Sequence, residues 1–197
     1  MSTVYCDLAI SLDGYLSGPD QRHDTPLGDG GILLHQWKFD EPELHERENA
    51  AVVDAGAFVM GRNMFAGPGD GPWAADWTGW WGAEPPYHGP VFVLTHHARE
   101  SVPMEGGTTF HFVTGGITEA LDRAREAAGD RDVSIAGGAS TANQYLAAGL
   151  VDELRLHLVP VLLGRGERLF DGGALTELAQ VDVRPTHSVT HLRYRLR

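Results

Sequence analysis

Asp132-Val133-Ser134-Ile135-Ala136-Gly137-Gly138-Ala139 is a short apolar run that ends in a pair of glycines. Such a run is typical of a buried strand, and the residues that follow, through Leu146 to a terminating Gly149, predict a helix. Glycine lets a backbone approach a ligand closely, and a helix that begins beside it directs free N–H groups and a positive dipole at an anion. The stretch therefore predicts a strand–turn–helix unit that binds a phosphate group or, in the simpler alternative, a tight turn alone.

The same order occurs at two other places in the chain. Val113-Thr114-Gly115-Gly116 precedes a predicted helix over residues 117–128, and Met60-Gly61-Arg62 closes another apolar run. Arg62 adds a guanidinium group, which suits phosphate, although its alternative role is an exposed surface charge. Ligands of open α/β sheets bind beyond the carboxyl ends of the strands. Three such ends together predict a phosphate-bearing ligand, most simply a dinucleotide.

The rest of the pattern indicates the fold class. Apolar runs predict further buried strands over residues 4–12, 57–60, 91–94 and 109–113. Asp40-Glu41-Pro42-Glu43 predicts the start of a helix that ends near Gly56, with Asp40 as its cap. Residues 154–159 alternate like a strand with one wetter face, Pro160 then requires a bulge or an edge, and residues 187–196 form a last strand. This order favours a three-layer α/β domain with an antiparallel edge.

Composition excludes several classes of protein. The chain has 197 residues, which suits a single domain, and 15 basic against 27 acidic residues give a net charge of −12. That charge disfavours nucleic-acid binding, and no stretch approaches the ~20 apolar residues of a membrane span. The single cysteine, Cys6, cannot form an internal disulfide, which favours the cytoplasm, and the first residues do not have the pattern of a signal peptide.

Four motifs, in this order along the chain, resemble the dihydrofolate reductase superfamily. The similarity is closer to the branch that contains the reductase domain of the bifunctional riboflavin-pathway deaminase-reductase. The motifs are Ile10-Ser11-Leu12-Asp13-Gly14-Tyr15-Leu16, Phe58-Val59-Met60-Gly61-Arg62, Ile135-Ala136-Gly137-Gly138-Ala139, and residues 149–156 continued by Pro160-Val161-Leu162-Leu163-Gly164. The resemblance implies a three-layer α/β/α dihydrofolate reductase-like fold over residues 1–197, with a mixed, mainly parallel central sheet and antiparallel C-terminal edge strands.

The resemblance also implies an NADPH-dependent reductase that passes a hydride to a small planar heterocyclic or carbonyl substrate. Residues would meet the cofactor in three groups. The nicotinamide group is Ala9, Ile10, Leu16 and Gly18; the adenosine and 2′-phosphate group is Gly61, Arg62, Asn63, Met64, Thr95 and His96; the pyrophosphate group is Gly137, Gly138, Ala139, Ser140 and Thr141, with Gly115 at a neighbouring strand end. Arg62 and a protonated His96 supply positive charge, which favours NADPH over NADH.

A proton donor is the remaining need of hydride transfer. Folate reductases place a carboxylate on the first helix, and the corresponding position falls near His45 with Glu46 beside it. Neither residue matches that pattern cleanly. Asp13 is a third candidate, although its alternative role is to cap the turn after the first strand. The catalytic residue is therefore left open among these three.

Two rival functions follow from the same residues. The missing carboxylate motivates a non-catalytic nucleotide-binding or scaffold protein of the same fold. A genuine folate or riboflavin-pathway reductase, acting on 5-amino-6-ribosylaminouracil phosphate, is the other. That substrate needs basic residues near the first helix, where the chain offers Arg22, Lys38 and Arg47 among acids. The chain has no zinc signature of a deaminase and no His or Cys spacing of a structural zinc site, so no metal is expected.

Residues 66–90 fit neither helix nor strand periodicity and hold four of the five tryptophans. This segment could roof a substrate pocket, hold down a long loop as a small apolar cluster, or form a dimer interface. Relatives in the deaminase-reductase branch commonly dimerise. The resemblance therefore implies a homodimer, with residues 154–163 and 187–196 as its expected interface.

Overall fold

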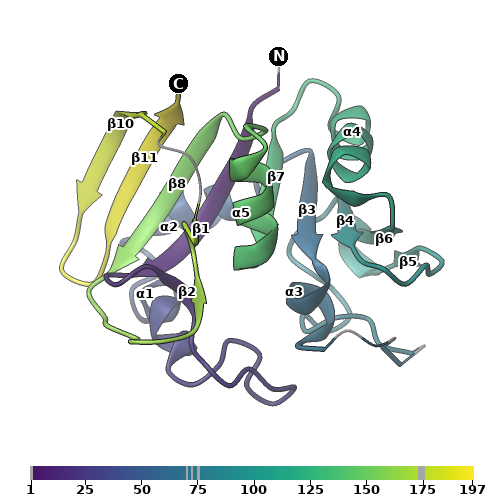
Figure 1. Ribbon diagram of the computed structural model, residues 1–197, viewed down its shortest axis with the longest axis horizontal. Helices are drawn as coiled ribbons and strands as arrows, with labels where there is room; N and C mark the ends of the chain where they lie inside the picture. The colour runs from purple at the N-terminus through teal and green to yellow at the C-terminus, as the bar shows by residue number, and fades with distance from the viewer. Residues whose placement is uncertain (1, 70, 72, 75, 173–175) are drawn as a thin grey trace.

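We describe a computed structural model of the chain, covering residues 2–197 except 70, 72, 75 and 173–175. Nine strands form one mixed sheet (Figure 1). In spatial order they are β10 (Leu178–Pro185), β11 (Thr190–Leu196), β8 (Glu153–Val159), β1 (Val4–Ser11), β7 (Val133–Gly137), β3 (Ala57–Gly61), β4 (Pro90–Leu94), β6 (Thr109–Val113) and β5 (Val102–Pro103). The strands from β8 to β6 pair in parallel, whereas β11, β10 and β5 pair antiparallel. The predicted mainly parallel sheet with antiparallel C-terminal edge strands is confirmed.

Helices cover both faces of this sheet and make the fold three-layered. One face packs against α4 (Gly116–Ala128) and α5 (Ala139–Ala147), whose Leu121 and Tyr145 join the core formed by alternate β1 residues such as Cys6 and Leu8. The opposite face carries α1 (Gln36–Asp40), α2 (Glu46–Val53) and α3 (Arg62–Ala66). Strict alternation along β1 places Tyr5, Asp7 and Ala9 on that second face.

Short elements complete the chain. A small second sheet pairs β2 (Tyr15–Ser17) with β9 (Glu167–Arg168), and single turns of 3₁₀ helix form η1 (Gly31–Leu34) and η2 (Glu105–Gly107). No helix among the described residues is both long enough and apolar enough to cross a membrane.

The segment around Pro42 differs from the sequence prediction. Asp40 ends α1 instead of capping a new helix, and α2 begins later, at Glu46, with His45 as its cap residue. The residue before a proline is pushed out of helical conformation, and Glu41 accordingly has φ −137° and ψ 52°. Pro42 thus separates two helices where the sequence predicted one.

The antiparallel edge also departs from expectation. Strand β10 was missed, although its pattern of Val181 and Val183 between polar residues indicates an exposed strand. The polar face of β8 was expected to be exposed to solvent, yet Glu153 and His157 on that face are only 3% and 4% exposed. Because α1 and α2 cover that face, these polar side chains are enclosed in a buried network.

Candidate functional site

One large cavity lies at the carboxyl ends of the parallel strands. It has a volume of about 850 Å³ and is lined by the ends of β1, β3, β4, β6 and β7, together with residues of the 16–39 segment and of α1, α3 and α5. The lining includes Gly61 at the end of β3, Leu94 at the end of β4 and Gly137 at the end of β7. This is the position where open α/β sheets bind their ligands.

The N-terminus of α5 opens into this cavity. Gly138 is its cap residue, and Gly138 to Thr141 all line the cavity. The first hydrogen bond of the helix runs from the Ala142 N–H to the Gly138 carbonyl at 3.0 Å, so the N–H groups of the three preceding residues have no helical partner. Gly137 has φ +118°, a conformation that a side chain rarely adopts. Free N–H groups and a helix dipole in a cavity wall suit an anionic group such as a pyrophosphate.

Arg62 lines the cavity from α3, but its terminal nitrogens are already occupied. They donate to the carbonyl oxygens of Gly67, Gly69 and Gly71, and the guanidinium lies 5.4 Å from the ring centre of Trp73. In this structure Arg62 therefore holds the start of the tryptophan-rich segment. The exposed His96 lines the same cavity, and Arg62 Nε has no partner among the described residues.

The tryptophan-rich segment divides between the cavity and the apolar core. Trp80 and Trp81 line the cavity, as a roof would. Trp73 and Trp77 pack instead against the apolar cluster around Phe65, and the Trp77 Nε1 donates to the Phe65 carbonyl at 2.8 Å. Residues 70, 72 and 75 of this segment lie outside the described residues.

Unpartnered polar atoms gather in the cavity wall. Among the described residues, four buried side-chain atoms have no hydrogen-bond partner: Ser17 Oγ, Arg62 Nε, Trp80 Nε1 and Arg193 Nε. The first three belong to residues that line this one cavity. Buried polar groups in native proteins are almost always hydrogen-bonded, and each exception calls for an explanation.

The predicted cofactor residues converge here with three exceptions. Thirteen of the sixteen line the cavity, whereas Ile10, Gly18 and Gly115 are not among its described lining residues. Ile10 points into the core on the opposite face of β1. A Cβ added to Gly18 would lie 1.9 Å from the Asp29 carbonyl oxygen, and one on Gly115 would meet the Glu119 carboxylate at 1.8 Å. These two glycines therefore allow close packing within the protein.

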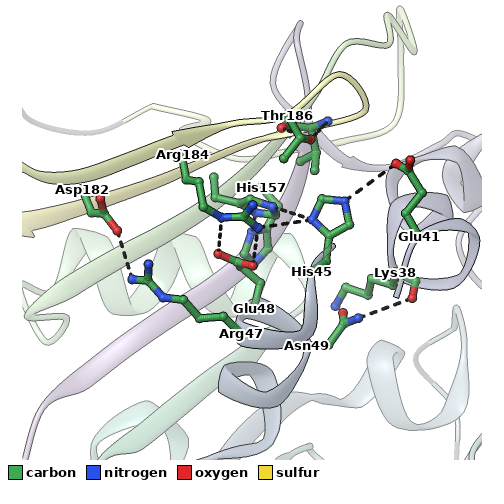
Figure 2. A network of polar contacts seen from close by, with 12 residues as sticks. Lys38, Glu41, His45, Arg47, Glu48, Asn49, His157, Asp182, Arg184 and Thr186 are labelled. Atoms are coloured by element: carbon green, nitrogen blue, oxygen red, sulfur yellow. Dashed lines mark hydrogen bonds and ion pairs between the residues drawn. The ribbon is translucent and has the colours of Figure 1, made fainter. Parts of the chain in front are cut away.

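None of the three catalytic candidates is among the described residues that line this cavity. Asp13 accepts hydrogen bonds from the Leu163 and Gly164 N–H groups at 3.1 and 2.7 Å, which joins two loops. Glu46 is exposed in the first turn of α2. His45 is completely buried in the polar network of Figure 2.

Sequence reasoning named Lys38 as a basic residue near the first helix but missed the two other polar groups at the α1 end of the cavity, Asp7 and His35. Asp7 of β1, with His35 and Lys38 of the α1 region, lines that end. Burial lowers the pKa of His35 to about 4 and lowers the pKa of Lys38, which Asp7 partly opposes. The available signal was Asp7 itself, a carboxylate within an otherwise apolar strand and on the same face as Ala9.

A group of three buried residues has the donor atoms of a metal site. Ligand atoms of His45, Glu48 and His191 lie within 4.8 Å of one another. Arg184, however, donates to both carboxylate oxygens of Glu48, with 2.9 Å from Nε to Oε1 (Figure 2). The ring nitrogens His45 Nδ1 and His191 Nε2 are 2.9 Å apart, the length of a hydrogen bond. The arrangement fits a hydrogen-bonded network with a fixed cation better than a metal centre.

The fold and the cavity together define the class: a three-layer α/β protein with the dihydrofolate reductase-like arrangement and a ligand cavity at the strand ends. Residues 2–192 match the family described as the RibD C-terminal domain, and the chain belongs to that family. A curated relative, the Bacillus subtilis protein YyaP, is 25% identical over 177 residues, which cover 85% of this chain and 79% of YyaP.

Solved structures show the same fold. A diaminohydroxyphosphoribosylaminopyrimidine deaminase/5-amino-6-(5-phosphoribosylamino)uracil reductase from Thermotoga maritima superposes with a TM-score of 0.63 at 15% identity; the match covers 99% of this chain and 56% of that one. Dihydrofolate reductase from Enterococcus faecalis, complexed with NADP(H), gives a TM-score of 0.57 at 15% identity, with 98% and 96% of the two chains covered. At these identities the likeness establishes the fold.

Proposed function

We propose that this protein is an NADPH-dependent reductase that transfers a hydride to a small planar heterocyclic or carbonyl substrate. The observation that carries the proposal is the cavity itself, because the open N-terminus of α5 lies in its wall at the strand ends and three of the residues that line it hold a buried polar atom without a partner. Membership of the RibD C-terminal domain family supports it, as does the NADP(H) bound by the dihydrofolate reductase of the same fold.

The cavity wall fits each part of such a cofactor. Gly137 to Thr141 line the part of the cavity assigned to a pyrophosphate, where residues 139–141 offer backbone N–H groups, and Arg62 and His96 line the part assigned to a 2′-phosphate. Ser17 Oγ, beside Leu16 in the segment assigned to the nicotinamide, has no hydrogen-bond partner among the described residues, and we assign it to the carboxamide. When bound, the dihydronicotinamide ring supplies the hydride. The chain's own task is to position the two partners and exclude water.

The α1 end of the cavity favours a planar, largely uncharged substrate. Apolar surface comes from Phe39, Val52, Trp81 and Tyr87, and polar groups come from Asp7, His35 and Lys38. Large flat apolar surface with a few polar groups is typical of sites that bind heterocycles.

Two of the three basic residues noted near the first helix form ion pairs and do not line the cavity. Arg22 pairs with Asp29 at 2.9 Å, and Arg47 pairs with Asp182 at 3.0 Å. Lys38 is the third, and it alone of these three lines the cavity. This distribution argues against a substrate that carries a ribose phosphate. The carboxylate of Asp7 in the cavity likewise argues against a protein that only binds nucleotide.

Titration with NADPH and NADH, followed by nicotinamide fluorescence and tryptophan quenching, tests the cofactor. We expect micromolar affinity for NADPH and weaker binding of NADH. A panel of quinones, pterins and cyclic imines then tests turnover through loss of absorbance at the NADPH band. Binding of neither cofactor would overturn the proposal, and binding without turnover on any compound would leave the nucleotide-binding alternative standing.

A homodimer in the cytoplasm completes the proposal. The strands β8, β11 and β10 present an apolar face that no helix covers in Figure 1, and that carries Leu158, Leu192 and the 40%-exposed Val183. The opposite face of the same strands holds the buried polar network. A second copy of this chain, packed face to face, would remove that apolar surface from water. The single cysteine, Cys6, is buried and free, which suits a reducing compartment.

A further inference from the structure

The single lysine of this chain lies in the wall of the large cavity. Of the 15 lysines and arginines in the sequence, 14 are arginines and only Lys38 is a lysine. Arginine keeps its proton in proteins, whereas a lysine ammonium can release one. Lys38 is partly buried on α1 and lines the α1 end of the cavity together with Asp7 and His35. The one side-chain amine of the chain is thus placed where a substrate would bind.

The ammonium group of Lys38 has no partner within the described part of the chain. Its Nζ forms no ion pair or hydrogen bond there, and no dashed line reaches it in Figure 2. The Asn49 amide donates to the backbone carbonyl of Lys38 at 3.4 Å, and the ring centre of Trp37 lies 5.2 Å from Nζ. The three N–H groups of the ammonium are therefore available to a ligand in the cavity.

The fold brings three polar groups together at this end of the cavity. His35 is the residue before α1, and the Lys38 N–H donates to its carbonyl oxygen at 3.0 Å. Residues three apart lie on the same side of a helical turn. From the sheet, β1 presents Asp7 on the face that α1 covers. A carboxylate, an imidazole and an amine thus line one end of the cavity.

A row of buried histidines holds Asp7 in place from the other side. His157 Nε2 lies 2.8 Å from Asp7 Oδ1, and His157 Nδ1 lies 2.7 Å from His191 Nδ1. His191 Nε2 lies 2.9 Å from His45 Nδ1. Trp37 packs against all three imidazoles with ring centres 4.9 to 5.1 Å apart. The row therefore fixes the position of the carboxylate in the cavity wall.

Burial and charge together set how tightly Lys38 holds its proton. Burial lowers the pKa of Lys38 below the ordinary 10.5, and the negative charge of Asp7 acts in the opposite direction. Burial also lowers the pKa of His35 to about 4, with the positive charges of Lys38 and His157 acting in the same direction, so His35 is neutral at pH 7. Burial raises the pKa of Tyr87, which makes this cavity hydroxyl a weaker acid. Lys38 is thus a charged donor that releases its proton more readily than an exposed lysine does.

We propose that Lys38 is the general acid of the reduction and gives a proton to the substrate as the hydride arrives. The inference rests on the proposed reductase function. The carbon of a C=O or C=N bond gains the hydride from the dihydronicotinamide, and the electron pair of the double bond moves to the oxygen or nitrogen. That atom takes one proton from the Lys38 ammonium. The neutral amine regains a proton from solvent before the next turnover.

The place of Lys38 suits this step. Asp7 and Ala9 are successive residues on one face of β1 and line the same cavity, and Ala9 is assigned to the nicotinamide. A lysine side chain carries its donors on a flexible four-carbon stem, so the ammonium can follow the substrate heteroatom. The alternative role of Lys38 is packing alone, in which the stem covers the Trp37 ring and the ammonium reaches water.

Two substitutions of Lys38 separate proton donation from charge and from packing. Lys38→Met keeps an apolar stem without charge, whereas Lys38→Arg keeps the charge but cannot release the proton. We expect both to slow hydride transfer about 10²- to 10⁴-fold, the usual contribution of a general acid, with NADPH affinity within about threefold of wild type. Arg47→Met is the matched control, because Arg47 is an exposed cation of α2 that pairs with Asp182 and is not among the described lining residues. It should leave the rate unchanged.

The pH dependence of the rate gives a second readout. A general acid must be protonated, so the wild-type rate should fall as the pH rises through the Lys38 pKa, which lies below 10.5, and Lys38→Arg should lose this fall. The wild-type rate should also be lower in D₂O, and both Lys38 variants should lose that effect. If Lys38→Arg turns over within about threefold of wild type, Lys38 supplies charge alone. If Lys38→Met does so, its role is structural, and either result overturns the proposal.

A measurement without substrate separates this inference from the proposed function. Because the chain has one lysine, protein grown with ¹³C,¹⁵N-lysine gives side-chain signals from Lys38 alone. We expect these signals to titrate below pH 10.5, and Asp7→Asn should move the midpoint lower because it removes a negative charge that favours the ammonium form.

The two ways of failing give different results. A wild-type midpoint at or above 10.5 that Asp7→Asn does not move would overturn the role of Lys38 and leave a reductase with another proton donor. Binding of neither NADPH nor NADH would overturn the reductase function, and the general acid with it, without changing this midpoint.

Discussion

Alanine substitution of two buried serines, Ser11 at the end of β1 and Ser17 at the end of β2, should change the stability of the protein in opposite directions. Ser17 is 6% exposed, and its hydroxyl has no partner among the described residues while its residue lines the large cavity. Ser11 is fully buried, but its hydroxyl donates to Asp13 Oδ1 at 2.6 Å and accepts from the Tyr15 N–H at 2.9 Å. The two side chains are thus almost equally buried, but only the Ser11 hydroxyl has hydrogen-bond partners.

The magnitudes follow from that difference. An unsatisfied buried hydroxyl costs about 1–3 kcal/mol, so Ser17→Ala should stabilise the free protein by about 1–2 kcal/mol. For a chain of this size that corresponds to a melting temperature about 2–8 °C higher. Ser11→Ala should destabilise it by about 1–2 kcal/mol because two partners are left unpaired. Ser17→Ala should also weaken NADPH binding about 3- to 10-fold, the value of one neutral hydrogen bond.

Thermal denaturation with and without NADPH, together with fluorescence titration, measures both effects on the same samples. If the Ser17 hydroxyl serves a ligand, its removal must both stabilise the free protein and weaken ligand binding. Removal of a hydroxyl with a purely structural role cannot have both effects. If Ser17→Ala melts below wild type, as Ser11→Ala should, or binds NADPH with unchanged affinity, the assignment of the Ser17 hydroxyl to the cofactor is wrong.

Three other outcomes are expected. Glu48→Gln should cost about 3 kcal/mol at pH 7, the low end for a broken buried pair, because the Arg184 side chain keeps 30% exposure. Burial acts to raise the Glu48 pKa, but the Arg184 hydrogen bonds outweigh it and hold the pKa below its usual 4.5. The stability difference between variant and wild type in urea denaturation should therefore shrink as the pH falls below about 4.5, and an equal difference at pH 7 and below pH 4.5 would contradict this account. His96→Ala should weaken NADPH at least threefold more than NADH in the same titration, and equal losses would show that His96 does not read the 2′-phosphate. Val183→Asp should convert a dimer to a monomer in sedimentation velocity with an unchanged melting curve of the monomer, because Val183 is exposed on β10; wild-type protein that is monomeric at micromolar concentration would remove the dimer altogether.

Much of the fold was predictable because local signals agreed with the global arrangement. Apolar runs that end in glycine predicted β3 and β7. The order of strands and helices along the chain predicted the parallel sheet with its antiparallel edge. The helix over residues 40–55 was predicted wrongly because the helical spacing of Leu44 and Ala51 was given more weight than the break that Pro42 imposes on Glu41. The strand β10 was missed because its valines stay exposed at a sheet edge and form no buried run.

The part of the site that is formed by backbone groups could be predicted from the sequence. The part that depends on side chains from different strands and helices meeting in space could not. Glycines at strand ends located the cavity, since their role depends on local conformation alone. The polar chain from Asp7 to Glu41 draws on β1, β8, β11 and the α1–α2 segment. Alternation along β8 indicates that Glu153 and His157 share a face, but only the packing of α1 decides whether water reaches that face.

Strand β1 connects the two halves of the cavity and explains why they can serve different purposes. On one side it pairs with β7, whose end and the following α5 present N–H groups to an anion. On the other side it pairs with β8, which begins the row of histidines. Asp7 and Ala9 are successive residues on one face of β1, and both line the cavity. The Ala9 position and the Asp7 carboxylate therefore lie one strand repeat apart, roughly 7 Å, a separation that a single planar ring in the cavity can bridge.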